Sequence, residues 1–159
     1  MRKIRDNFTN SFRGKKIIIT GHTGFKGSWL SFWLNKLGAN VLGISDQILT
    51  YPSFFEACNI KKKINSSTLD IKNFKKLQKK VLTFKPDYIF HLAAQALVKK
   101  SYDQPLLTWQ SNTLGTINLL ETLRNYKTIG KTIEFVSGNE QIKTALARVV
   151  GGGNLPPIA

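Results

Sequence analysis

Long apolar runs and cysteine are both scarce in this sequence. No apolar run approaches the ~18 residues of a transmembrane helix, and polar residues rather than a signal-peptide core follow the basic N-terminus. We therefore expect a cytoplasmic protein with no membrane partner. The single cysteine, Cys58, excludes an internal disulfide and is interpreted as a packed small apolar residue. No metal site is predicted.

Acidic residues are also few, 9 against 24 basic ones, which gives a net charge of +15. Such a charge raises nucleic acid, anionic membranes or polyphosphate-bearing ligands as partners. Nineteen of the basic residues are lysine and five are arginine, whereas specific readout of bases or phosphates favours arginine. We therefore interpret most lysines as solvated side chains on helix faces, and nucleic acid is not an expected partner.

The sequence does contain a regular alternation of apolar strands and helices within 159 residues, enough for one domain. The first strand, 16–20, is a β-branched run, and residues at helical spacing follow it up to Gly38. Further strands are predicted at 40–45, 64–70, 87–94 and 132–137, and further helices at 71–84 and 105–126. This order predicts an α/β fold, a Rossmann-type doubly wound parallel sheet of about five strands, incomplete and followed by an irregular tail.

A glycine-rich turn joins the first strand to its helix. A nucleoside-triphosphate loop requires Gly-x4-Gly-Lys-Ser/Thr, but here the lysine precedes the glycine in Lys26-Gly27-Ser28. The spacing of Gly21, Gly24 and Gly27 instead matches the Rossmann turn of tyrosine-dependent short-chain dehydrogenases. One glycine turns the chain, one lets the backbone approach a pyrophosphate, and one lets the helix pack closely. The pyrophosphate would lie at the helix N-terminus, near Phe25; a purely structural turn is the alternative.

The turn and its surroundings also resemble a known family. Thr20-Gly21-His22-Thr23-Gly24-Phe25-Lys26-Gly27-Ser28-Trp29-Leu30 closely resembles the opening signature of the CDP-glucose 4,6-dehydratases, which are extended short-chain dehydrogenases/reductases. Similar motifs follow in order at 52–56, 70–71, 91–95, 97–98, 101–102 and 112–116. The resemblance covers roughly 12–136. It implies NAD as cofactor and a nucleotide-sugar substrate, CDP-glucose converted to CDP-4-keto-6-deoxyglucose for deoxysugar and surface-polysaccharide synthesis.

The resemblance also implies which residues contact the cofactor. The backbone around the three glycines would hold the NAD pyrophosphate, and Asp70 would accept a hydrogen bond from the adenine amino group. We add Asp46 to the predicted cofactor contacts. A ribose-binding carboxylate is expected ~20 residues beyond the turn, and Asp46 lies close to that position, although the family has an apolar residue there. The full set is Gly21, His22, Thr23, Gly24, Phe25, Lys26, Gly27, Asp46, Asp70, Ile71, Leu92, Ala93, Ala94 and Gln95.

Some of these residues have other interpretations. Asp70 alternatively caps the next helix, Lys26 is either a phosphate contact or a solvated lysine, and His91 is a packed strand histidine rather than a base. The resemblance further implies that Asn112 braces the fourth strand, and that the helix 105–126 contributes to a homodimer interface.

The family pattern breaks near the C-terminus. There the family has a Tyr-x3-Lys pair that acts on the sugar, and no Tyr-x3-Lys follows the long helix here. Ser137 is interpreted as the remnant of the family's hydroxyl position. Because the Tyr-x3-Lys pair is missing, we assign no catalytic residues. We expect an N-terminal arm, 1–13, an NAD-binding domain, 14–137, and a divergent flexible tail, 138–159, with the sugar-nucleotide domain absent.

We therefore expect the NAD-binding portion of a nucleotide-sugar 4,6-dehydratase, truncated and inactive alone. Two alternatives are a non-catalytic dinucleotide-binding module that acts with a partner chain and another NAD-dependent sugar-nucleotide epimerase or dehydratase. A basic nucleic-acid-binding protein is disfavoured because the lysines fall opposite apolar helix stripes.

Overall fold

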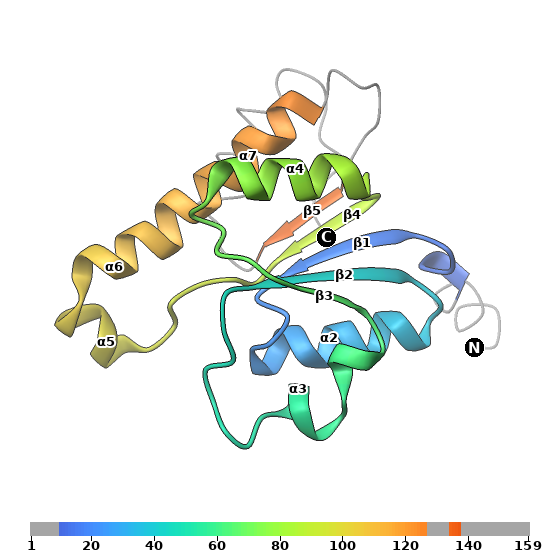
Figure 1. Cartoon of the computed structure of the whole chain (residues 1–159), viewed down its shortest axis with the longest axis horizontal. Coiled ribbons are helices and arrows are strands. Elements are labelled where there is room, and N and C mark those ends of the chain that lie inside the picture. Colours follow the sequence, from blue (N-terminus) through green and yellow to red (C-terminus); the bar gives the residue numbers. More distant parts are fainter. Residues whose placement is uncertain (1–9, 127–133, 138–159) are drawn as a thin grey trace, which may run out of the picture.

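A five-stranded parallel sheet organises the residues that the computed structural model describes, 10–126 and 134–137 (Figure 1). The strands are β1 (Lys16–Thr20), β2 (Asn40–Ser45), β3 (Asn65–Thr68), β4 (Tyr88–His91) and β5 (Glu134–Ser137). Their order, β3-β2-β1-β4-β5, is that of a doubly wound Rossmann-type sheet. The predicted fold class is confirmed.

Helices cover both faces of this sheet. On one face lie α2 (Phe25–Lys36), α3 (Phe54–Ala57) and the 3-10 helix η1 (Ile60–Lys62), and on the other lie α4 (Phe74–Phe84) and α7 (Gly115–Tyr126) (Figure 1). Two short helices, α5 (Val98–Asp103) and α6 (Pro105–Trp109), extend away from the sheet, and the π-helical turn η2 (Gln110–Leu114) joins α6 to α7. No helix in the described ranges is long and apolar enough to cross a membrane.

The central strand β1 supplies the core on both faces. Ile17 and Ile19 pack with Leu34 on the α2 side, whereas Ile18 packs with Leu77 on the α4 side. All three isoleucines of β1 are fully buried, as expected where helices cover both faces of a parallel strand. This explains why β1 is a continuous β-branched run rather than an alternating one.

The segment 105–126 differs from the single regular helix that was predicted, because the π-helical turn interrupts it. Its apolar residues also divide between two directions. Leu119 and Leu120 are buried, whereas Leu106, Trp109 and Ile117 are 71%, 68% and 53% exposed. The sequence pattern places these apolar residues on one stripe. The change in helical pitch and the packing against α4 divide them into a buried and an exposed group.

Several element boundaries also shift. The strands predicted at 64–70 and 87–94 are shorter, and the helix predicted from Ile71 begins at Phe74 because Asn73 caps it, accepting a hydrogen bond from the Lys76 amide (3.1 Å). The helices α3 and α5 were not predicted. Phe12, in the predicted arm, contacts the Tyr88 ring with centroids 5.6 Å apart. The rest of that arm up to residue 9, and the predicted tail 138–159, lie outside the described residues.

Candidate dinucleotide-binding site

Two of the three turn glycines are required by packing within the chain. Gly21 has a φ of +74°, and a Cβ there would lie 2.7 Å from the Leu92 carbonyl oxygen and the Ala93 nitrogen. A Cβ at Gly27 would overlap the carbonyl oxygen of Gly21, so α2 can approach the turn only through a glycine. These residues account for the sharp turn and the close helix packing.

Among the described residues, nothing gives Gly24 such an internal reason. Its backbone is extended (φ −71°, ψ 165°), and the nearest atom to a Cβ there would be the Gly21 oxygen at 3.4 Å, an ordinary contact. The chain itself would therefore tolerate a side chain at this position. The open space in front of Gly24 is available to a ligand that approaches the backbone, which is the role of the second glycine in a dinucleotide turn.

The N-terminus of α2 is prepared for an anion. Gly24 is its N-cap and offers no side-chain hydrogen bond, and the first turn contains no acidic residue. By contrast, the side chains of Ser53 and Asn73 cap α3 and α4. The first N–H groups of a helix have no partner within it and carry the positive end of its dipole. A pyrophosphate in front of Gly24 would satisfy these donors.

The predicted contact residues in the turn differ in the exposure and the hydrogen bonding of their side chains. The side chain of Phe25 is 73% exposed, and that of Lys26 is also exposed beside it in the first turn of α2. Thr23 is held in place by two contacts, because its hydroxyl donates to the Gln47 carbonyl (2.6 Å) and its amide lies 3.4 Å from Ser45 Oγ. The turn is thus held against the end of β2.

The side chain of His22 lies inside the protein rather than toward the open turn. It is 1% exposed, its ring packs edge-to-face on Phe55 (5.2 Å), and Nε2 is 2.7 Å from the Ser66 hydroxyl. Its ring also covers Gly43 so closely that a Cβ there would overlap it. Only the backbone of His22 can therefore face a cofactor.

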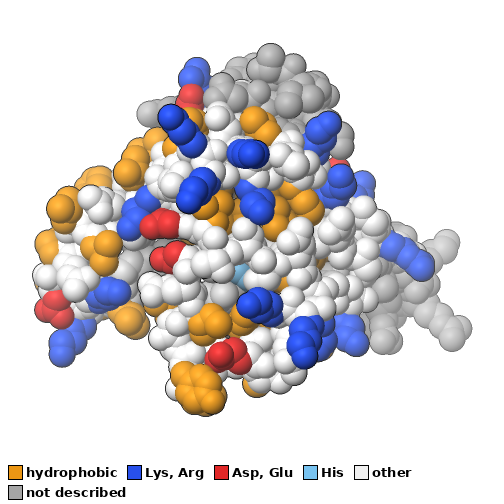
Figure 2. Space-filling model, viewed as in Figure 1, with side chains coloured by type: hydrophobic (Ala, Val, Ile, Leu, Met, Phe, Trp, Pro, Cys, Tyr) orange, Lys and Arg blue, Asp and Glu red, His pale blue; other side chains and the backbone are white. Residues whose placement is uncertain are grey.

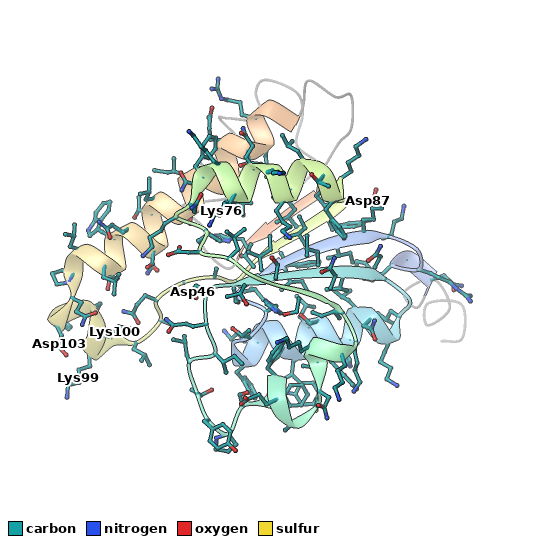
Figure 3. The ribbon with its side chains drawn as sticks, viewed as in Figure 1. Asp46, Lys76, Asp87, Lys99, Lys100 and Asp103 are labelled. Atoms are coloured by element: carbon teal, nitrogen blue, oxygen red, sulfur yellow. The ribbon has the colours of Figure 1, made fainter. Side chains whose placement is uncertain are left out.

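The two predicted carboxylates meet in one pocket. Asp46 follows β2 and Asp70 follows β3, and both line an open pocket of about 250 Å³ at the carboxyl ends of these strands. Thr68, Leu69, Asn73 and Lys76 complete the lining. Figure 3 shows Lys76 on α4 above Asp46. A pocket with acceptors from two neighbouring strands suits an adenosine, whose ribose hydroxyls and amino group are donors.

The structure also distinguishes the two interpretations of Asp70. Asn73 rather than Asp70 caps α4. One oxygen of Asp70 accepts a hydrogen bond from the Lys72 amide (2.8 Å), and the other lies 3.4 Å from Lys72 Nζ. The Asp70 side chain nevertheless remains 42% exposed. Its carboxylate therefore shapes the loop before α4 and still faces the pocket.

The lysines of α4 largely fit their interpretation as solvated side chains. Lys75, Lys76, Lys79 and Lys80 are exposed, and Figure 2 shows lysine and arginine side chains spread over the face that carries α4. Lys76 is the exception in position, because it also lines the pocket of Asp46 and Asp70. Lys76 was not predicted as a site residue, since the only available signal was its position in the first turn of the helix that follows Asp70.

The opposite wall of the site is the predicted segment 92–95, which follows β4. Leu92 and Ala93 lie against Gly21, and Ala94 is exposed. The Gln95 amide donates to Asn112 Oδ1 (2.7 Å), and Asn112 Nδ2 donates to the Gln95 carbonyl (3.1 Å). The resemblance implied that Asn112 braces the fourth strand; the structure shows it holding the segment after β4 instead. Ile71 is 7% exposed, so only its backbone can contact a ligand.

His91 is a packed strand residue, 5% exposed, and not a base in an open site. Its Nδ1 lies 2.7 Å from Thr20 Oγ1 and its Nε2 lies 2.9 Å from Thr116 Oγ1. Sequence reasoning missed both threonines, because nothing in the local pattern brings residues so distant in sequence together. Ser137 pairs in register with His91 at the end of β5, but its side chain lies outside the described atoms.

The two buried histidines predict acid sensitivity of the fold. Burial lowers the pKa of His22 and of His91 from 6.5 to about 4. Between these values the unfolded chain binds more protons than the folded one, so acid favours unfolding. We expect the free energy of unfolding to be constant above pH 6.5 and to fall by about 2 kcal/mol per histidine by pH 5.

Urea denaturation at pH 7, 6 and 5 measures this effect. His91→Gln, which cannot titrate in this range, should show about half of the wild-type slope. An unfolding free energy that stays flat from pH 7 to pH 5 in the wild-type chain would contradict the burial of neutral histidines.

Comparisons with known proteins agree with this geometry. A sequence model of the GDP-mannose 4,6-dehydratase family matches residues 18–141. CDP-glucose 4,6-dehydratase of Salmonella typhimurium is 44% identical over 128 residues, which are 80% of this chain and 36% of that protein. The chain thus spans about a third of the length of such relatives.

Solved structures show the same fold. UDP-glucose 4-epimerase of Thermotoga maritima, with UDP-glucose, matches at a TM-score of 0.65 and 27% identity over 77% of this chain and 37% of that one. The NAD complex of UDP-glucose 4-epimerase from Thermus thermophilus matches at 0.61 and 30% identity, over 70% and 34%. The cofactor prediction, NAD, is confirmed at the level of the family. The chain therefore belongs to the GDP-mannose 4,6-dehydratase family, a group of nucleotide-sugar dehydratases and epimerases built on an NAD-binding fold.

Proposed function

We propose that this chain binds NAD(H) and forms the cofactor-binding portion of a nucleotide-sugar 4,6-dehydratase. The observation that carries the proposal is Gly24, a glycine that packing within the chain does not require, at the uncapped N-terminus of α2. Bound NAD supplies a hydride acceptor. The first-turn amides of α2 would bind its pyrophosphate, with Gly21 and Gly27 holding the turn in place.

The rest of the cofactor would follow the two walls described above. Asp46 would accept hydrogen bonds from the adenosine ribose, and Asp70 would accept one from the adenine amino group, because both carboxylates line one pocket. The segment 92–95, held by Asn112, would form the other wall beside Gly21. These residues bind and orient the cofactor, and none of them moves a proton.

Within the family, CDP-glucose is the substrate we propose for the whole enzyme. The support is 44% identity to a CDP-glucose 4,6-dehydratase, against 27–30% for the two epimerase structures described above. No Tyr-x3-Lys occurs anywhere in the 159 residues, so the groups that would act on the sugar are not among them. We therefore propose that these residues by themselves supply cofactor binding and no dehydratase turnover.

A homodimer through the 105–126 segment is part of the proposal. Its support is the exposed apolar face formed by Leu106, Trp109 and Ile117, more than half exposed in each case. Large exposed apolar patches mark interaction surfaces. A second copy of the chain could bury this face.

The preference for NAD over NADP tests the proposed site. Asp46 would accept from the ribose 2′-hydroxyl and repel a 2′-phosphate. We expect calorimetry to show NAD binding at least about tenfold tighter than NADP. Asp46→Asn should narrow this ratio by weakening NAD and strengthening NADP.

Asp87→Asn provides the matched control. Asp87 accepts from the Lys16 amide (2.8 Å) at the start of β1, and Figure 3 shows it far from Asp46. This variant should keep the wild-type ratio. Equal affinities for the two dinucleotides, or an unchanged ratio in Asp46→Asn, would count against the proposed ribose contact.

A further inference from the structure

The segment 92–95 is attached near each end to a polar side chain, Thr20, which is buried, and Asn112, which is half-buried. At one end the Ala93 amide donates to Thr20 Oγ1 (3.3 Å). At the other end Gln95 exchanges two hydrogen bonds with the Asn112 side chain (2.7 and 3.1 Å). The two anchors come from different elements, β1 and the π-helical turn η2. The contacts that join these two anchors therefore determine how rigidly the backbone of 92–95 is held.

His91 joins them. Its Nδ1 lies 2.7 Å from Thr20 Oγ1, and its Nε2 lies 2.9 Å from Thr116 Oγ1. The Thr116 hydroxyl in turn donates to the backbone carbonyl of Asn112 (2.6 Å). A continuous path therefore runs from Ala93 through the imidazole to Gln95, so it begins and ends on the segment that it holds.

The protons along this path have one consistent order. Because the Thr116 hydroxyl gives its proton to Asn112, its oxygen must accept from His91 Nε2–H. Neutral His91 then presents an unprotonated Nδ1, which accepts from the Thr20 hydroxyl, and Thr20 Oγ1 accepts from the Ala93 amide. Each group donates once in the same direction, and such chains are cooperative in a low-dielectric interior.

We propose that His91 is a positioning residue for the dinucleotide site, which fixes the backbone of 92–95 by linking Thr20 on β1 to Thr116 on α7. It acts at a distance, since it is 5% exposed and cannot touch the cofactor itself. This inference rests on the proposed function. It adds three residues, 20, 91 and 116, that the cofactor contacts do not include.

Paired valine substitutions test the path. Thr20→Val and Thr116→Val each break one of the two imidazole contacts, and each should weaken NAD binding about tenfold. The double variant should bind NAD about as weakly as either single variant, because one break already releases the path. Thr116→Ser should restore the wild-type affinity in calorimetric titrations.

Thr122→Val is the matched control. Thr122 is also buried on α7 and also donates to the carbonyl four residues earlier, Asn118 (2.9 Å), whereas the hydrogen bonds described for His91 go to Thr20 and Thr116. It should lose stability as Thr116→Val does and keep the wild-type NAD affinity. Equal affinities in Thr116→Val and Thr122→Val, or effects of Thr20→Val and Thr116→Val that multiply, would overturn the proposal.

Two NAD-independent measurements separate this proposal from the proposed function. Nitrogen NMR of the wild-type chain at pH 7 should show His91 as the Nε2–H tautomer, and an Nδ1–H tautomer would contradict the proton order. Hydrogen exchange at the Ala93 and Gln95 amides should be faster in Thr116→Val but not in Thr122→Val. If the wild-type chain fails to bind NAD, the proposed function fails, and this exchange comparison still decides whether His91 fixes the segment.

Discussion

Gly24→Val is expected to abolish NAD binding while the chain keeps its fold. The extended backbone at Gly24 accepts a side chain, and a Cβ would meet only the Gly21 oxygen at 3.4 Å. The branched side chain would instead occupy the space in front of the α2 N-terminus, where the pyrophosphate must approach. We expect affinity to fall at least ~100-fold, equal to ~2.7 kcal/mol. Calorimetry for binding and a thermal melt for folding measure the two effects.

Gly24→Ala provides a graded comparison for this result. Its single methyl group should weaken NAD binding less than valine does, and the melting temperature of both variants should stay near that of the wild type. NAD affinity that is unchanged in Gly24→Val would mean that the open space at this glycine has no role in binding.

Gly27→Ala, unlike Gly24→Val, is expected to destabilise the fold. Its Cβ would overlap the Gly21 carbonyl oxygen and approach the Gly21 carbon at 2.8 Å and the His22 Cα at 2.9 Å. These are backbone atoms, which cannot rotate away, so α2 would have to move off the turn. We expect a loss of about 3 kcal/mol in the free energy of unfolding, at the upper end of overpacking effects.

Urea denaturation measures this loss, and Gly24→Ala is again the control because the same methyl group is added three residues away. If Gly27→Ala and Gly24→Ala unfold at the same urea concentration, the close approach of α2 to the turn is wrong.

The features that were predictable from the sequence are the local ones. A β-branched run, three glycines at fixed spacing and an apolar helix stripe are contiguous in the chain, so β1, the turn and α2 could be recognised together. The parallel, doubly wound sheet followed from the alternation of elements, since parallel strands need crossover helices. Asp46 and Asp70, near the ends of two predicted strands, were both expected to contact the cofactor, and the structure brings them together in one pocket.

Side-chain directions were less predictable because tertiary packing decides them. His22 lies within the turn but points into the interior, where the absence of a side chain at Gly43 makes room for its ring. Ile117 and Leu120 belong to one helix, yet one is exposed and the other buried. Neither distinction is visible in a pattern of apolar residues.

Long-range contacts were the hardest to foresee. Thr20 and His91 are partners in the register of β1 and β4, although 71 residues separate them. Thr116 reaches the same imidazole from α7, across the layer between helix and sheet. Such a path depends on the register of two strands and on the rotation of one helix, and no local sequence signal specifies both.

The most direct test of the dinucleotide site is an NMR titration of the full chain with NAD. We predict saturable binding, with the largest amide shifts at Gly24–Gly27, at the Asp46 and Asp70 pocket and along 92–95. NADP should produce the same pattern at higher concentration. Absence of saturable binding by the folded chain, or shifts confined to surfaces away from the carboxyl ends of β1 to β4, would contradict it.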